Sequence, residues 1–175
     1  MLGGKNLGLL DTATGALMVT PLGGSPVQTG VTPDGKFAVV SLYDMKQLAV
    51  FDPTAKEVST ITLPASSRGP IQMYPTPDSR FFYLADQGYY FGEPASEWVY
   101  KIDLASRSVV AEIRAGNAPH GVVVAPDGSR VYVTNLLGGD VSVIDTATDR
   151  EITRIPVGKE PNGISYWSRE RGGTP

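Results

Sequence analysis

Residues 116–158 read GNAPHGVVVAPDGSRVYVTNLLGGDVSVIDTATDREITRIPVG, and this stretch contains four short runs with the composition of β-strands. Each run is either continuously apolar or alternates between apolar and polar residues, and the runs cover 122–124, 130–134, 141–145 and 151–157. Turn-forming residues separate the runs, beginning with Pro126-Asp127-Gly128. Four strands in a unit of about forty residues are typical of one β-propeller blade.

Three sequence markers show that this unit repeats along the chain. The turn Pro33-Asp34-Gly35 recurs 44 residues later as Pro77-Asp78-Ser79, and 49 residues after that as Pro126-Asp127-Gly128. The aspartate that ends the third strand recurs as Asp11, Asp52, Asp103 and Asp145, and the proline before each unit as Pro26, Pro70, Pro119 and Pro161. The phase of these markers predicts one propeller domain over residues 1–175, with a partial blade (1–22), complete blades (26–63, 70–114, 119–157), a closing strand (162–167) and a tail (168–175).

The second run of the quoted stretch is Val131-Tyr132-Val133-Thr134-Asn135, and here the chain resembles the YVTN-type β-propeller repeat family. The resemblance is strong over residues 116–158 and weaker over the rest. It implies an all-β fold of four-stranded antiparallel blades. We expect about four blades, three complete and one partial, which would make half of a seven- or eight-bladed ring.

Composition excludes several classes of protein. The net charge is −3 and the basic residues are scattered, so the basic stripe expected of a nucleic-acid-binding protein is missing. The chain has no cysteine, which excludes disulfides and thiolate nucleophiles. No run approaches the length of a membrane span, and no secretory signal is visible. The compartment stays open, although the resembled family is largely periplasmic or found at the cell surface.

Candidate binding residues gather on one face of the expected propeller. The first strand of each blade is innermost, so the residues after the marker prolines lie nearest the axis: Gln28, Gln72, His120 and Asn162. The loops between strands two and three reach the same face and contribute Asp44, Asp86 and Asn135, with Arg68 nearby. The loop over 86–98 is an insertion, and its aromatic residues, Tyr89, Tyr90, Phe91 and Trp98, favour a binding surface or, equally, a local cap on the blade.

His120 is the only histidine in the chain and has two interpretations. It could bind a metal or haem or transfer protons, because imidazole coordinates metals and titrates near neutral pH. It could also be a hydrogen-bonded rim residue, and this second interpretation is favoured because no other metal ligand lies at a suitable spacing. The recurring aspartates are expected to stabilise turns.

No nucleophile motif, phosphate-binding glycine loop, dinucleotide fingerprint or zinc motif is present. We therefore expect a non-catalytic binding module without catalytic residues, metal or cofactor, which recognises a partner protein or a small ligand on the axial face. The alternative is an enzyme, because the resembled family is similar to lactonase-type enzymes and to the haem-carrying propellers of nitrite reductases.

The second strand of the closing blade is missing, so ring closure needs an explanation. We expect a homodimer in which residues 164–167 of each copy lie beside residues 7–10 of the other, giving about eight blades. The rival expectation is a tight four-bladed ring, in which the same two segments pair within one chain.

Overall fold

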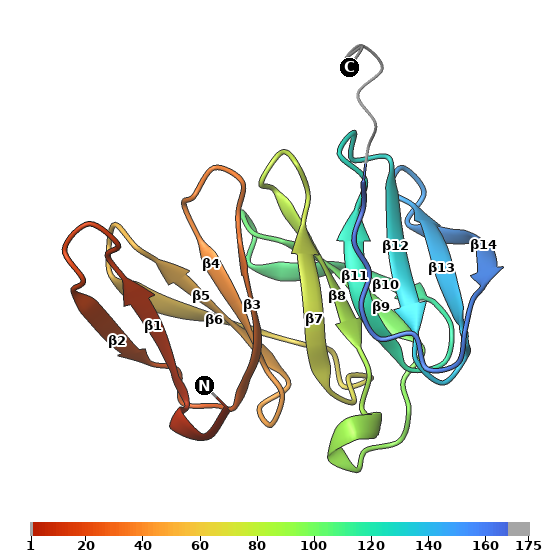
Figure 1. The fold of residues 1–175 in the computed structure, drawn as a ribbon, viewed down its shortest axis with the longest axis horizontal. Helices are drawn as coiled ribbons and strands as arrows, with labels where there is room; N and C mark the ends of the chain where they lie inside the picture. The colour runs from red at the N-terminus through yellow and green to blue at the C-terminus, as the bar shows by residue number, and fades with distance from the viewer. Residues whose placement is uncertain (1, 168–175) are drawn as a thin grey trace.

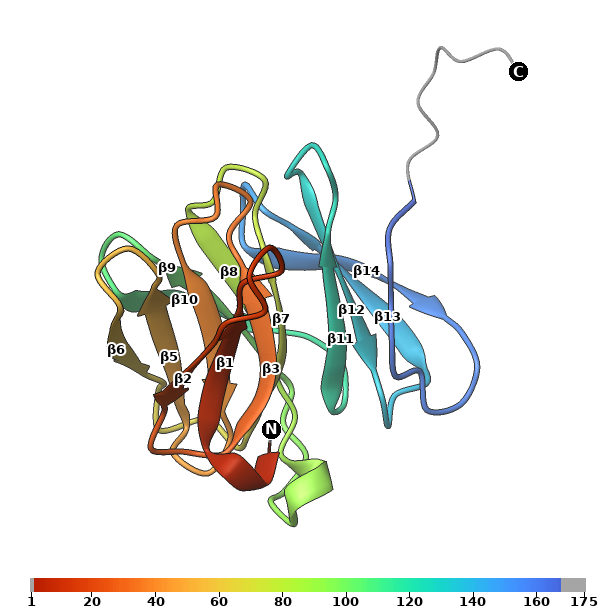
Figure 2. The ribbon, with the colours of Figure 1, turned by 60° about the vertical axis from the view of Figure 1, so that its left-hand side comes forward.

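The computed structural model describes residues 2–167, and within them the chain forms an open fan of antiparallel sheets (Figures 1 and 2). A two-stranded sheet of β1 (Asn6–Leu10) and β2 (Leu17–Pro21) comes first, after the 3₁₀ turn η1 (Leu2–Gly4). Three four-stranded sheets follow, so the prediction of an all-β fold of propeller blades is confirmed.

Each four-stranded sheet is a simple meander and falls within a predicted repeat unit. The first blade contains β3 (Pro26–Val31), β4 (Ala38–Leu42), β5 (Gln47–Asp52) and β6 (Glu57–Thr62). The second contains β7 (Pro70–Pro75), β8 (Phe81–Asp86), β9 (Trp98–Asp103) and β10 (Ser108–Arg114). The third contains β11 (Pro119–Val124), β12 (Arg130–Asn135), β13 (Asp140–Asp145) and β14 (Arg150–Pro156).

The predicted role of the repeating aspartates in turns is also confirmed. Asp127 Oδ1 accepts a hydrogen bond from the N–H of Ser129 at 2.9 Å, and Asp34 and Asp78 make the equivalent bond. Asp145 Oδ1 accepts from the N–H groups of Ala147 and Thr148, both at 3.0 Å. The same pair of bonds recurs at Asp11, Asp52 and Asp103.

The core lies between the blades, and alternating residues of one strand face two different neighbours. In β8, Phe82 and Leu84 pack with Val39 and Val50 of the first blade. Tyr83 and Ala85 point to the other face and pack with residues of the third blade, including Val131, Val133 and Ile144. Because both faces of the central blade are buried, its second strand is almost continuously apolar.

The innermost strands β3, β7 and β11 neighbour one another and share one irregularity. The pairing shifts by one residue between Pro26 and Thr29, between Pro70 and Met73, and between Pro119 and Val122. Each shift is a β-bulge, which leaves two residues unpaired immediately after the marker proline. The bulge gives the positions of Gln28, Gln72 and His120 their special geometry, and the sequence markers did not predict it.

The prediction of a strand over residues 162–167 is wrong: these residues form no strand in the structure. A first strand needs a second to pair with, and residues 2–167 supply none beside it. The segment nevertheless lies against β11 and β12. Thr134 Oγ1 donates to the carbonyl oxygen of Asn162 at 3.3 Å, and the rings of Tyr132 and Tyr166 lie 5.9 Å apart. The predicted tail, 168–175, lies outside the described residues.

The rival four-bladed ring is not formed within the described residues. β1 pairs only with β2, and the two ends of the fan lie on opposite sides of the molecule (Figure 1). Within residues 2–167 the helical segments are the three-residue turns η1 and η2 (Tyr89–Phe91), and neither has the length or apolar character to cross a membrane.

Candidate functional site

The face that carries η2, which we call the axial loop face, holds the loops that precede each first strand and those that join second to third strands. It lies at the lower edge of the molecule in Figure 1, where η2 projects. His120, Tyr90 and Asn162 meet here. Gln28, Arg68, Asp44, Asp86 and Asn135 also lie at this end of the blades, but most of them have other partners.

Asp86 is fully buried and stabilises the loop that enters the second blade. Its carboxylate accepts hydrogen bonds from Ser67 Oγ at 2.7 Å, from the N–H of Arg68 at 2.7 Å and from the N–H of Gly69 at 2.8 Å. All three donors belong to the segment immediately before Pro70. The Asp86 carboxylate therefore positions backbone and is not presented to the axis.

Asp44 and Asn135 act similarly in the other two blades. Asp44 accepts from the N–H and hydroxyl of Ser25, at 2.7 and 2.8 Å, and these hydrogen bonds lower the pKa of its carboxyl. Asn135 accepts from the N–H of Gly116 at 3.2 Å and donates to Ser142 Oγ at 2.8 Å. These three candidate residues hold the loops between blades.

The glutamines at the bulge position differ from one another. Gln28 bridges the first two blades, because its Oε1 accepts the N–H of Met73 and its own N–H donates to Ser41 Oγ at 3.1 Å. Gln72 is half-buried in β7, and none of the described hydrogen bonds involves its side chain. The structure does not bring Gln28 or Gln72 together with His120.

The insertion reaches across all three blades. Phe91 stacks on Tyr43 of the first blade, with ring centroids 3.6 Å apart. Tyr90 contacts His120 of the third blade edge-on, with centroids 5.5 Å apart. Trp98, which the sequence placed in this loop, instead begins β9 and packs against the core between the first two blades. Tyr89 and Tyr90 stay about half exposed, at 50% and 52%.

His120 is buried, with 7% of its surface exposed, and its Nδ1 has no hydrogen-bond partner. Burial lowers the pKa of the imidazole, and a hydrogen bond to the Asn162 backbone opposes this shift. The ring is therefore favoured in its neutral form at pH 7. Asn162 completes the cluster, because its Nδ2 donates to the hydroxyl oxygen of Tyr90 at 3.4 Å.

Sequence reasoning missed Gln87, which lies between Asp86 and the insertion. Gln87 is fully buried, its Oε1 accepts the N–H of Tyr90 at 3.4 Å, and its Nε2 has no partner. Its place directly after a strand end that faces the axis was the available signal. Among the described residues, no group of three or more His, Cys, Asp or Glu side chains could hold a metal ion.

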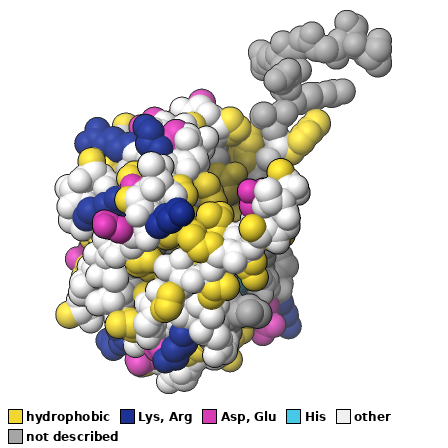
Figure 3. Space-filling model, turned by 90° about the vertical axis from the view of Figure 1, so that its left-hand side faces the viewer, with side chains coloured by type: hydrophobic (Ala, Val, Ile, Leu, Met, Phe, Trp, Pro, Cys, Tyr) yellow, Lys and Arg dark blue, Asp and Glu magenta, His cyan; other side chains and the backbone are white. Residues whose placement is uncertain are grey.

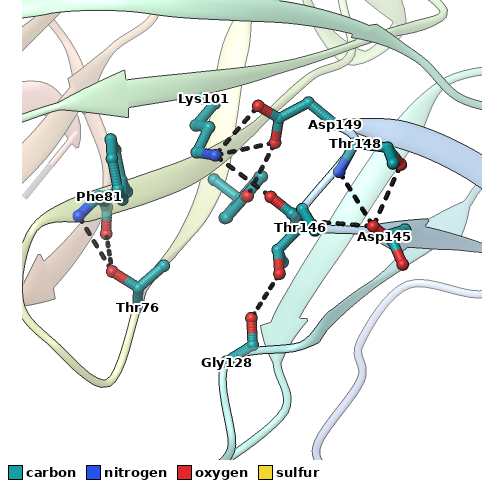
Figure 4. A network of polar contacts seen from close by, with 10 residues as sticks. Thr76, Phe81, Lys101, Gly128, Asp145, Thr146, Thr148 and Asp149 are labelled. Carbon is teal, nitrogen blue, oxygen red and sulfur yellow. Dashed lines mark hydrogen bonds and ion pairs between the residues drawn. The ribbon is translucent and has the colours of Figure 1, made fainter.

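A second cavity, of about 270 Å³, lies between the second and third blades at the opposite end, near the Pro-Asp turns. Lys101 reaches into this region and its Nζ lies 2.9 and 3.0 Å from the carboxylate oxygens of Asp149, and 3.5 Å from the carbonyl oxygen of Thr146 (Figure 4). Phe81 lies under the ammonium group at 4.6 Å. Because the donors of Lys101 have partners in the neighbouring blade, we interpret this cluster as a strut between blades.

Comparison with known proteins places the chain among β-propellers. It is 34% identical over 80 residues to a dihydro-heme d1 dehydrogenase from Pseudomonas aeruginosa, and these residues are 46% of this chain and 14% of that protein. Its fold is similar to that of hydrazine synthase from Kuenenia stuttgartiensis, with a TM-score of 0.78 at 21% identity. That match covers 90% of this chain and 44% of the other, so the chain spans less than half of either relative.

The likeness to hydrazine synthase, at this identity, shows a shared fold. The model of the YNCE-like β-propeller family matches residues 5–171, which is nearly the whole sequence. The chain belongs to the YNCE-like β-propeller family.

Proposed function

We propose that this chain is a non-catalytic binding module that recognises a partner protein or a small ligand on its axial loop face. One observation carries the proposal: η2 holds two half-exposed tyrosine rings above a buried histidine, in a loop anchored on both neighbouring blades. Tyrosine gives a large contact area at a small cost in side-chain entropy and is enriched where proteins bind ligands and partners. The rigid blades support the loop from below.

The three aromatic residues of η2 have different roles in this proposal. Phe91 is the anchor, because its stacking on Tyr43 fixes the turn to the first blade, and Tyr43 Oη donates to the carbonyl oxygen of Gly88 at 3.2 Å. Tyr89 and Tyr90 are the contact residues. Replacing Phe91 would therefore disturb the loop itself, and the contact surface is tested through the two tyrosines.

The experiment compares two double variants in a thermal-shift screen of a small-molecule library. Tyr89→Ala with Tyr90→Ala removes the proposed contacts. Tyr74→Ala with Tyr166→Ala removes two tyrosines of similar exposure, 42% and 43%, near the opposite end of the blades. Ligands that stabilise the native chain should lose their effect in the first variant and keep it in the second. Equal responses of the two variants would contradict the assignment of this face.

A second candidate function is a haem-associated or metal-dependent enzyme, and it is favoured by the 80-residue similarity to a protein named dihydro-heme d1 dehydrogenase. The fit of the residues is poor, because Tyr90 covers the His120 ring, and Asp44 and Asp86 are occupied by backbone N–H groups. Titration with haemin, followed by absorption spectroscopy, tests it. A Soret band that is lost in His120→Ala would support this function, and free-haemin spectra throughout would exclude haem binding at His120.

A further inference from the structure

Two buried polar atoms beneath η2 have no hydrogen-bond partner: Gln87 Nε2 and His120 Nδ1. Gln87 is 0% exposed and His120 is 7% exposed. Native proteins leave few buried polar atoms unpaired, because such atoms lose their bonds to water without replacement. Two of them under one short turn indicate a place built to receive a polar group.

Tyr90 connects the two atoms. Its N–H donates to the Oε1 atom of Gln87 at 3.4 Å, and its ring meets the His120 ring edge-on at 5.5 Å. Gln87 and His120, which are far apart in the sequence and lie on different blades, therefore flank a single residue. The Tyr90 side chain is 52% exposed and is tied at its hydroxyl by one hydrogen bond, from Asn162. Rotation of this side chain would open the site.

The backbone around Tyr90 is built from glycines in a conformation that other residues adopt with strain. Gly88 and Gly92 bracket η2 with φ of 78° and 81°. A Cβ at Gly88 would lie 2.3 Å from the carbonyl oxygen of Pro94, so the N-terminal bracket is also closely packed. The turn is thereby held at a fixed height over Gln87.

The charges around the turn decide which polar group fits. Glu97 pairs with Arg114 at 2.7 Å, and Glu93 pairs with Lys46 at 3.7 Å. Arg68 has no ion-pair partner within residues 2–167, and its Cβ lies against Gly88, 2.8 Å from the position of a Cβ built there. The unpaired groups are thus an amide donor, an imidazole and a guanidinium, all of which can donate to an oxyanion.

We propose that the site beneath Tyr90 binds the carboxylate of a small planar organic acid. Gln87 and His120 bind the carboxylate, Arg68 supplies the countercharge at the rim, and Tyr89 and Tyr90 pack against the body of the acid. This inference rests on the proposed function, because it names the ligand class for the same face.

His120 gives a direct readout, since it is the only histidine in the chain. With ¹⁵N-labelled histidine, the ring signals report on this site alone. Benzoate should shift them saturably, and benzamide, which has the same ring without the charge, should bind at least about tenfold more weakly, because charge-assisted hydrogen bonds are stronger. Gln87→Leu should abolish the benzoate response. Gln47→Leu, at the start of β5, is the matched control and should leave it unchanged.

Backbone amide spectra of both variants establish that the fold is retained. Unshifted His120 signals at saturating benzoate would overturn the proposal, and so would equal affinity for benzamide or an undiminished response in Gln87→Leu. The binding function itself fails separately: if other ligands still depend on Tyr89 and Tyr90 while benzoate does not bind, the assignment to carboxylates alone is wrong.

Discussion

At the scale of single residues, the turn between the third and fourth strands imposes one demanding backbone conformation. The last position of this turn has a positive φ in the partial blade and in all three complete blades: Gly15 (74°), Lys56 (59°), Arg107 (54°) and Asp149 (52°). Only glycine adopts this region without steric cost, so three of the four turns are strained at this position.

Lys56→Gly should therefore stabilise the protein or leave its stability unchanged. The left-handed conformation costs a non-glycine residue about 1–2 kcal/mol, and the greater freedom of glycine in the unfolded chain takes back about 0.5–1 kcal/mol. We expect a gain of roughly 0.5–1 kcal/mol in the free energy of unfolding, measured by urea denaturation. Lys36→Gly, at an exposed position of ordinary φ, is the control and should show no gain.

His120 predicts a second measurable effect, on the pH dependence of stability. Its pKa in the folded protein is lowered from 6.5 by burial, so the unfolded chain binds the proton more tightly. Stability should then fall as the pH drops below about 6.5, the unperturbed histidine value. Between pH 7.5 and pH 5.5 the wild type should lose more unfolding free energy than His120→Gln. Parallel profiles for the two proteins would show that burial does not perturb this imidazole.

At the scale of elements, the loops that enter the blades are held by side chains from the end of the second strand or just beyond it. Asp86 is the most buried of these and accepts three hydrogen bonds, whereas Asp44 performs the same task at an exposed position. A second link joins neighbouring blades: Ser41 Oγ donates to the carbonyl oxygen of Ile71 at 2.7 Å, as Thr134 does to that of Asn162. The segment after Pro161 thus occupies the place of a first strand although it forms none.

Asp86→Ala should cost far more stability than Asp44→Ala. The first change leaves two backbone N–H groups and one hydroxyl without their acceptor in a buried loop, which we expect to cost about 3 kcal/mol or more. The second exposes its donors to water, and a cost of about 1 kcal/mol is expected. Thermal and urea unfolding of both variants measures the difference. Similar costs would mean that the Asp86 loop finds other partners.

The sequence could predict those features that depend on neighbours in the chain. Pro126-Asp127-Gly128 and its counterparts fixed the strand count and phase, because turn chemistry is local. The bulge after each marker proline depends on pairing across the blade, and the contact between Tyr90 and His120 joins residues of two blades. No local pattern contains that information. The missing strand at 162–167 had a correct local pattern, but a strand forms only where a neighbour pairs with it.

At the scale of the whole molecule, stability arises at the interfaces between blades, because each sheet buries its faces against its neighbours. The two ends of the fan have no such neighbour within residues 2–167. Hydrophobic side chains gather on the face seen from the β1–β2 end (Figure 3), and Leu9, Leu10, Leu17 and Val19 of this hairpin are 46–63% exposed. At the other end, Trp167 is 80% exposed. Exposed apolar surface of this kind is normally covered by another chain.

We propose that a second copy of the chain covers both ends, with the 164–167 segment of each copy beside the β1–β2 hairpin of the other. Two fans of this size would make a ring of about eight blades, within the usual range for propellers. Light scattering on the chain, whose mass is 18.6 kDa, should then report twice that mass. Trp167→Ser should weaken the dimer, whereas Leu137→Ser, which changes an exposed residue outside the proposed contact, should leave it intact. A compact monomer at micromolar concentration would contradict the two-chain ring, since both apolar ends would then remain in water.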